Sequence, residues 1–298
     1  MSRANPTIVA ELLRAMRPQH WVKNVFVLAP LVFAQQVRDV PQAARVMAAF
    51  GLFSLLASAV YLINDITDRH ADRLHPDKCS RPIASGTLPP GVAAGAAVVL
   101  VVLSLGGAVL LGGNLVMVLA AYLTMNLAYS FALKRVVVLD VMLLSSGFLL
   151  RAWAGAVVIE VAMSHWLMLC TGLISLFLGF VKRRQELIGL GAEAATQRPI
   201  LREYSLPFLD QTVSTVTAGT IVAYSLYAFS PEVAQKLGTE WMGLTIPFVV
   251  FGIFRYLYLV YHRGYGQNPT ALILHDRPLL LDLALWAAVS LLALYGGF

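Results

Sequence analysis

Charged residues are scarce in this sequence. Asp, Glu, Lys and Arg together make up 13% of its 298 residues, while 58% are hydrophobic. A typical soluble domain contains roughly 25% charged residues, so the composition excludes an ordinary globular fold. The mean hydropathy of +0.73 indicates a membrane protein instead.

Cysteines, histidine clusters and a signal peptide are scarce or missing as well. The sequence has only two cysteines, Cys79 and Cys170, which gives no indication of a disulfide framework or a cysteine-based metal site. The six histidines are scattered without the spacing of metal ligands. No small-residue cleavage site separates the amphipathic segment Ile8–Met16 from the first apolar run, so we expect no signal peptide.

What the sequence does contain is nine apolar runs, most of them close to the ~20 residues that an α-helix needs to cross a bilayer. The first run is short and contains Pro30, which favours a kink; Gly112 and Gly113 separate the third run from the fourth. The runs are Trp21–Val37, Gln42–Ile63, Gly91–Leu111, Asn114–Leu133, Val136–Ile159, Met163–Val181, Pro207–Phe229, Trp241–Tyr261 and Pro278–Tyr295. They predict an all-α, polytopic membrane protein with about nine transmembrane helices around a central polar cavity. We expect residues 1–298 to form a single domain, with an amphipathic segment at residues 1–20.

The positions of the 22 Lys and Arg residues predict the orientation of these helices. With alternating loops, 17 of them lie on the side of the amino terminus, three lie on the opposite side, and Arg151 and Arg255 lie inside runs. Because cytoplasmic loops are enriched in Lys and Arg, we expect the amino terminus and the long charged loops to be cytoplasmic. This pattern also accounts for the pI of about 9.4 without a nucleic-acid partner, since the basic residues form no single patch.

The densest group of charges follows the second run, between Tyr61 and Gly86. Asp65, Asp68 and Asp72 are spaced i, i+3 and i+7, so they share one face if the preceding helix continues through them. Asn64 lies on a neighbouring strip. Three stacked carboxylates repel one another, and a hard cation such as Mg²⁺, which prefers oxygen ligands, would relieve the repulsion. Solvation, or pairing with nearby Arg and Lys, is the alternative.

Other polar residues lie inside or at the ends of apolar runs. Asp140 and Arg151 are separated by three helical turns in the fifth run, where an ionisable residue is costly and usually faces a polar cavity or a partner. A role in helix packing is the alternative. Three consecutive cations beginning at Lys182 follow the sixth run and suit phosphate oxygens, unless they only fix the orientation. The segment Arg183–Leu206 contains no Asp.

The order Asn64-Asp65-x-x-Asp68-x-x-x-Asp72, followed by Arg81-Pro-Ile-Ala-Ser-Gly, resembles the first motif of the UbiA superfamily of intramembrane prenyltransferases. In that family the aspartates carry Mg²⁺ bound to a diphosphate. The resemblance therefore implies that Asp65, Asp68 and Asp72 are catalytic and, with Asn64, are the metal ligands. Many members have a second Asp-rich motif after the sixth span. This sequence departs from that pattern, which argues against the usual prenyl diphosphate donor.

Three further stretches extend the resemblance over nearly the whole chain: Arg17-Pro-Gln-His-Trp-Val-Lys-Asn24, the region Tyr129–Arg151, and Lys182-Arg-Arg-Gln-Glu-Leu187. They resemble the branch that transfers 5-phosphoribose from phosphoribosyl pyrophosphate to a polyprenyl (decaprenyl) phosphate. This implies a Mg²⁺-dependent step toward decaprenyl-phosphoarabinose for cell-wall arabinan, in the bacterial cytoplasmic (inner) membrane. By family analogy it also implies a homo-oligomer such as a trimer. The residues expected to bind the substrates are Lys23, Asn24, Asn64, Arg81, Tyr129, Lys134, Arg151, Lys182, Arg183 and Tyr204.

Two alternatives stay open. An aromatic prenyltransferase of quinone or haem biosynthesis fits the first motif, but the missing second Asp motif argues against it. A polytopic lipid transporter or flippase would also have many spans and internal charges, but the dense, one-sided cluster of Asp and Arg disfavours it. Turnover of a Mg²⁺-bound diphosphate donor distinguishes the enzymes from the transporter.

Overall fold

The computed structural model describes residues 7–75, 78–190, 199–263, 272 and 275–296. Within these ranges the protein is helical and has no β-strand, which confirms the prediction of an all-α fold. Eight helical segments in the described part of the chain are long and apolar enough to cross a membrane, so the protein is a multi-pass membrane protein. The eight segments are α3 (Val40–Thr67), α6 (Pro90–Leu111), α7 (Gly113–Phe131), α8 (Leu139–Val158), α9 (His165–Leu190), α11 (Leu206–Phe229), η5 (Trp241–Thr245) continuing into α13 (Ile246–Arg263), and α15 (Arg277–Tyr295).

The run expected to form the first span differs from the prediction. It forms the 3₁₀-helix η1 (Pro18–Val27) and the short helix α2 (Ala29–Phe33), and neither is long enough to cross a bilayer. Pro30 lies inside this run and cannot donate a backbone hydrogen bond, which is one reason why no long α-helix forms. The remaining short elements are α1 (Ile8–Met16), α4 (Arg69–Leu74), α5 (Pro82–Ser85), η2 (Leu133–Arg135), η4 (Pro199–Glu203) and α12 (Pro231–Leu237).

Several of the long helices begin with the same local signal. The side chain of Asp39 accepts a hydrogen bond from the backbone N–H of Gln42 at the start of α3. Ser205 and Asp276 do the same for α11 and α15, and in all three helices a proline follows within the first two helical positions. A polar cap followed by proline satisfies free N–H groups and presets the backbone for a helix.

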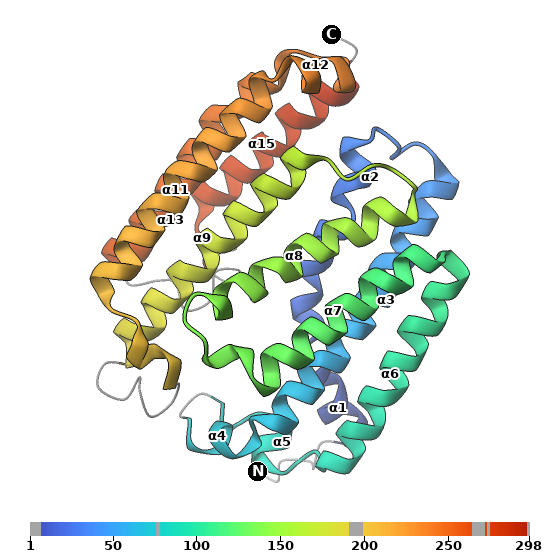
Figure 1. Ribbon diagram of the computed structural model, residues 1–298, viewed down its shortest axis with the longest axis vertical. Helices are drawn as coiled ribbons and strands as arrows, with labels where there is room; N and C mark the ends of the chain where they lie inside the picture. Colours follow the sequence, from blue (N-terminus) through green and yellow to red (C-terminus); the bar gives the residue numbers. More distant parts are fainter. Residues whose placement is uncertain (1–6, 76–77, 191–198, 264–271, 273–274, 297–298) are drawn as a thin grey trace. The chain divides into compact units, whose positions relative to one another are not determined.

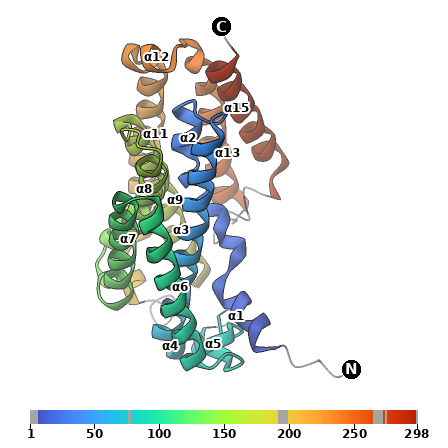
Figure 2. The same cartoon turned by 90° about the vertical axis from the view of Figure 1, so that its right-hand side faces the viewer.

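The chain divides into two compact units. The first comprises Met1–Val32, Val37–Leu143 and Leu150–Ala162. Its central helix, α3, packs against α6, α7 and η1 (Figure 1). Figure 2 shows α1 beside α5 at the end of this unit where α3 leads into α4. Short elements thus lie beside the charged end of α3.

Small residues allow close helix packing in this first unit. The buried positions of α6 recur at helical spacing and are mostly small: Ala93, Ala97, Leu100, Ser104 and Ala108. Between membrane helices, such positions let the backbones approach each other. Gly155 is the extreme case, because a Cβ there would overlap the carbonyl oxygen of Val27. The close approach of α8 to η1 therefore requires glycine.

One side chain joins three helices at the start of α3. Arg45 donates from Nε to the carbonyl of Val158, at 2.8 Å, and from Nη2 to the carbonyl of Leu111, at 3.1 Å. These two residues end α8 and α6, whose last carbonyls have no partner inside their own helices. Arg45 thus satisfies two helix ends at once.

The second unit comprises Phe33–Gln36, Leu144–Leu149 and Met163–Phe298. Within it, α9 packs against α11 and α13 packs against α15, while η5 contacts α11 and α15 (Figure 1). The hydroxyl of Tyr224 lies 2.7 Å from that of Thr245 and accepts a hydrogen bond from the indole of Trp286 at 2.9 Å. This buried chain of hydrogen bonds ties α11, η5 and α15 together.

Candidate functional site

The helix α3 does not continue through the aspartate motif. It ends at Thr67, and Asp68 adopts φ −93° and ψ 6° before α4 begins at Arg69. Asp65, Asp68 and Asp72 were expected to share one face if the helix continued through them. That condition is not met, because the helix is interrupted at Asp68. Asp65 belongs to the last turn of α3, and Asp72 belongs to a separate short helix.

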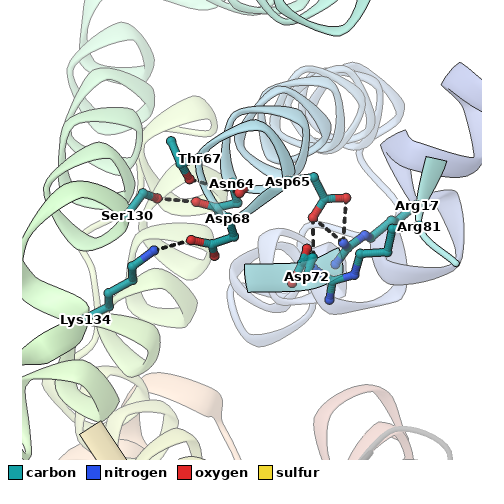
Figure 3. Close-up of polar contacts among 9 residues, drawn as sticks. All are labelled: Arg17, Asn64, Asp65, Thr67, Asp68, Asp72, Arg81, Ser130 and Lys134. Carbon is teal, nitrogen blue, oxygen red and sulfur yellow. Dashed lines mark hydrogen bonds and ion pairs between the residues drawn. The ribbon is translucent and has the colours of Figure 1, made fainter. Parts of the chain in front are cut away.

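Two arginines contact Asp65 and Asp72, and one of them, Arg81, joins the two acids (Figure 3). One terminal nitrogen of Arg17 lies 2.6 and 2.8 Å from the two carboxylate oxygens of Asp65. A terminal nitrogen of Arg81 lies 3.1 Å from Asp65 and 2.6 Å from Asp72. The side chains of these two acids are only 3% and 5% exposed. We call these four residues the arginine cluster. Burial makes its charge-assisted hydrogen bonds stronger than they would be in water.

The other half of the motif faces α7 and η2. The ammonium of Lys134 lies 2.5 Å from a carboxylate oxygen of Asp68, and the hydroxyl of Ser130 donates to the side-chain oxygen of Asn64. Figure 3 shows Asn64 and Asp68 pointing away from Asp65 and Asp72. We call these four residues the lysine cluster. Three carboxylates thus meet three cations: Lys134 on η2, Arg17 between α1 and η1, and Arg81 at the start of α5.

The cations nearest in sequence do not all serve the motif. Among the nearby cations, Arg81 joins the arginine cluster, whereas Arg73 donates from Nε to the carbonyl of Ala84 at 2.9 Å. Arg17 and Lys134, which do pair with the motif, are 48 and 66 residues away from their partners. The counter-charges therefore come mainly from tertiary structure.

A second polar group is buried inside the first unit. The guanidinium of Arg151, on α8, donates from Nε to Asn24 at 2.7 Å and from Nη2 to the hydroxyl of Tyr122 at 3.1 Å. It also lies 5.2 Å from the ring centre of Phe53, a cation–π contact. Asn24 in turn donates to Ser54 at 2.9 Å. The structure thus joins Arg151 and Asn24, two residues expected to bind substrate, in one network.

Lys23 precedes Asn24 on η1, outside the eight spanning helices. Burial, together with the positive charges of Arg151 and Arg17, lowers the pKa of the Lys23 ammonium to about 8. Desolvation and like charges both disfavour the protonated form of an amine. Lys23 therefore occupies an environment in which an anion would be favoured. Tyr129 lies half-buried on α7, next to Ser130 of the lysine cluster.

The remaining expected residues belong to the second unit. Lys182 and Arg183 were expected to begin a loop, but α9 continues to Leu190, so both lie inside the helix. Arg183 is buried and donates to Glu186 at 2.7 Å, while the ammonium of Lys182 lies 3.9 Å from the same carboxylate group. Tyr204 is buried beside Phe208. That these residues face the aspartate motif, across a central polar cavity, stays a prediction.

Arg184 has a different environment from its two neighbours. Its guanidinium forms an ion pair with Asp210 and lies 3.8 Å from the ring centre of Tyr261. The hydroxyl of Tyr261 donates to the same carboxylate at 2.7 Å. These contacts tie α9 to α11 and α13 and give Arg184 a structural role.

A model of the UbiA prenyltransferase family matches residues 24–275. The chain belongs to the UbiA prenyltransferase family. This UbiA protein is 38% identical over 301 residues to a decaprenyl-phosphate phosphoribosyltransferase of Mycolicibacterium smegmatis, covering 97% of this chain and 93% of the relative. A relative of the same name from Mycobacterium tuberculosis is 39% identical over 286 residues, covering 94% and 93%.

Solved structures of UbiA proteins share the fold. The structure of a UbiA homolog from Archaeoglobus fulgidus bound to DMAPP and Mg²⁺ gives a TM-score of 0.72 at 15% identity, covering 95% of this chain and 99% of the other. The apo structure of a UbiA homolog from Aeropyrum pernix K1 gives 0.67 at 14% identity, covering 92% and 96%. At such identities these structures establish the fold of this UbiA protein alone, while its membership of a transferase family rests on the family model and the curated relatives.

Sequence reasoning missed two residues that contact the motif of this UbiA protein. Arg17 was named only as the first residue of the stretch that ends at Asn24, and Ser130 was not named as a site residue. A signal for Arg17 was present, because it stands between an amphipathic helix and Pro18 at the expected membrane surface. For Ser130 the only signal was its position one helical turn before Lys134.

Proposed function

We propose that this UbiA protein transfers 5-phosphoribose from phosphoribosyl pyrophosphate to a polyprenyl phosphate, with decaprenyl phosphate as the acceptor. The observation that carries the proposal is the charged end of α3, where three carboxylates meet Arg17, Arg81 and Lys134. Relatives named for this reaction, 36–39% identical over most of the chain, support it. A single UbiA-like domain formed by both units is part of the proposal.

Mg²⁺ dependence is part of the proposal. The motif offers carboxylate and amide oxygens, which are the ligands that Mg²⁺ prefers. Among the described residues, no three Asp, Glu, His or Cys side chains are grouped to hold an ion. Mg²⁺ commonly takes one or two protein carboxylates and completes its shell with water and substrate phosphate, so the donor set fits. In the proposal Asn64 and Asp68 of the lysine cluster and Asp65 and Asp72 of the arginine cluster would hold the ion between them, once the cations of both clusters turn to substrate phosphate. When bound, it neutralises charge on the leaving pyrophosphate.

The cations of the first unit supply the remaining contacts to phosphate. Arg81 and Lys134 already bind carboxylate oxygens at 2.6 and 2.5 Å, and phosphate oxygens accept the same N–H donors. Lys23, Asn24 and Arg151 form a second cationic group, joined by the Arg151–Asn24 bond. In the proposal both groups orient the donor so that its anomeric carbon faces the acceptor. In the proposal Tyr129, next to Ser130, lines the donor site with a polar side chain.

The acceptor needs no strong base from the protein. The phosphate of a polyprenyl phosphate is ionised near neutral pH, so one of its oxygens attacks the anomeric carbon directly. The new carbon–oxygen bond forms as the bond to pyrophosphate breaks, and pyrophosphate leaves with the electron pair. We infer that the lipid reaches this point from the bilayer.

The cations of the second unit have a distinct task in the proposal. Phosphoribosyl pyrophosphate carries a phosphate on the far side of its ribose, outside the reach of a metal on the motif. Lys182, 41% exposed, and Arg183 would hold this phosphate, with Tyr204 beside them. The missing second Asp motif favours such a donor over a prenyl diphosphate, which has no distal phosphate.

We place the reaction at the cytoplasmic face of the bacterial inner membrane. The distribution of Lys and Arg supports this orientation, with the amino terminus and the motif in the cytoplasm. The product would lead toward decaprenyl-phosphoarabinose for cell-wall arabinan. Assembly as a homo-oligomer, such as a trimer, belongs to the same proposal by analogy with the family.

The decisive experiment compares donors with the purified protein in lipid nanodiscs. Labelled phosphoribosyl pyrophosphate with a polyprenyl phosphate should give a lipid product, while a prenyl diphosphate with 4-hydroxybenzoate should give none. Product in only the second reaction would replace the proposal with an aromatic prenyltransferase. Turnover in neither reaction, with transbilayer movement of labelled polyprenyl phosphate in vesicles, would favour a transporter.

A further inference from the structure

The amino-terminal helix α1 is attached to the first unit by its inner face. Leu12, Ala15 and Met16 pack against the core cluster that includes Leu62. Glu11, although charged, is only 5% exposed, and it accepts a hydrogen bond of 2.9 Å from the hydroxyl of Thr87. An apolar face and a buried polar contact therefore fix α1 beside α5, as Figure 2 shows.

Arg17 ends this helix in an uncommon backbone conformation. Its φ of 56° and ψ of 60° are left-handed, and the next residue is Pro18. Residues with a Cβ rarely adopt this region, and the residue before a proline is normally extended. Glycine is the usual residue at such a helix end. What arginine adds at this position is its side chain.

The side chain of Arg17 returns to the last two turns of α3. Its terminal nitrogen contacts both carboxylate oxygens of Asp65 at 2.6 and 2.8 Å, and its guanidinium carbon lies 5.1 Å from the ring centre of Tyr61. Tyr61 and Asp65 are one helical turn apart, so they line the same strip of α3. The side chain is 18% exposed. Arg17 is thus held at both its backbone and its head group.

We infer that Arg17 is a positioning residue that acts through Asp65. Together with Arg81 it keeps the Asp65 carboxylate turned toward Asp72 and away from Asp68, as Figure 3 shows. Helix α1 delivers Arg17, so the amino-terminal helix belongs to the diphosphate-binding machinery. The inference rests on the proposed function, in which the motif binds the metal-bound diphosphate of the donor.

A double-mutant cycle on ligand binding tests this assignment. Binding of Mg²⁺-pyrophosphate to the full-length protein in nanodiscs is measured by calorimetry for Arg17→Ala, Asp65→Asn and the double variant. We expect each single change to weaken binding about tenfold and the double variant to bind no more weakly than Asp65→Asn alone, because residues that act as one unit are not additive. Arg17→Lys should restore part of the loss, since it keeps the charge.

The matched control is Arg14→Ala, one turn earlier on the same helix. The side chain of Arg14 is 58% exposed and contacts Glu11 rather than the motif, so binding should be unchanged. Thr87→Val removes the hydrogen bond to Glu11 that holds α1, together with a contact to the carbonyl of Pro82 on α5, and leaves the four motif residues unchanged. We expect it to weaken binding about threefold in the native background and not at all beside Asp65→Asn.

Two results would overturn the inference in distinguishable ways. Additive losses in the Arg17 and Asp65 cycle would remove Arg17 from the positioning role while leaving the proposed function intact. A native protein that binds no Mg²⁺-pyrophosphate would overturn the proposed function and, with it, this inference. If Arg17→Ala does not yield folded protein, the cycle is run with Arg17→Gln, which keeps the volume and removes the charge.

Discussion

The end of α3 and the end of α9 are both crowded with charge, but their charges are neutralised differently. In α9, Lys182 and Arg183 find Glu186 within one helical turn. At the end of α3, Asp65 and Asp68 find Arg17 and Lys134 at separations of 48 and 66 residues. Local pairs survive small changes in packing, whereas distant pairs exist only when several elements are in place. The pairs of the motif therefore depend on the tertiary structure of the first unit, whereas the pairs of Glu186 lie within α9 itself. Arg184, which pairs with Asp210 on α11, is the exception on that helix.

Asp68→Asn should have the largest effect, because it removes a carboxylate at the end of α3. Loss of a carboxylate that holds the metal-bound donor should lower turnover by about 100-fold or more, while the protein remains folded because the pair with Lys134 is partly exposed. The measurement is donor turnover beside a thermal melt in detergent. Glu186→Gln, the acid of α9, is the matched control and should cost far less. Near-normal turnover of Asp68→Asn, or full activity in excess chelator, would contradict the metal site.

Lys182→Ala should have the next largest effect, on the affinity for the donor. If Lys182 holds the distal phosphate of the donor, its loss removes one charge-assisted hydrogen bond, which corresponds to about tenfold in affinity. Binding of phosphoribosyl pyrophosphate should therefore weaken about tenfold, and binding of pyrophosphate should not change, since only the donor carries that phosphate. Equal weakening of both ligands would place Lys182 at the diphosphate.

A smaller effect concerns pH. The pKa of Lys23 is lowered to about 8 by burial and by Arg151 and Arg17, so the free protein loses this charge as the pH rises through that value. If Lys23 binds phosphate in its protonated form, kcat/KM for the donor should fall several-fold between pH 7 and 9. Lys23→Arg stays charged over this range and should flatten the profile. The same decline in both proteins would assign it to another group.

The smallest expected effect is on stability alone. Asp210→Asn removes the charge that pairs with Arg184 between α9 and α11. Because the Asp210 side chain is 42% exposed, water screens this pair, and the loss should be about 1 kcal/mol or less. We expect a slightly lower melting temperature and unchanged donor kinetics. A marked loss of donor binding would instead place Arg184 in the site.

The positions of the long helices followed from the sequence, and two of them did so almost residue by residue. The runs Gly91–Leu111 and Pro207–Phe229 correspond to α6 and α11, whose ends differ by one residue at most. Length and hydropathy decide such helices, because a bilayer leaves a helix as the only way to satisfy the backbone. The run Trp21–Val37 does not form one long helix. One reason is Pro30, which lies inside the run and cannot donate a backbone hydrogen bond.

The candidate site was less predictable, and the reason is physical. The motif residues were identified by type and spacing, but helical spacing assumes a continuous helix, and Asp68 interrupts it. The partners Arg17 and Ser130 are set by how α1 and α7 pack on α3. Spacing along the chain carries no information about such contacts. The extension of α9 to Leu190 was missed because polar residues at a membrane surface suit a helix and a loop equally well.

The three-helix contact of Arg45 has a consequence for biogenesis. Its two carbonyl partners, Leu111 and Val158, are made 66 and 113 residues after it. Arg45 therefore cannot make these contacts until α6 and α8, respectively, have been synthesised. The contact among the three helices is complete only once the end of α8 has been made.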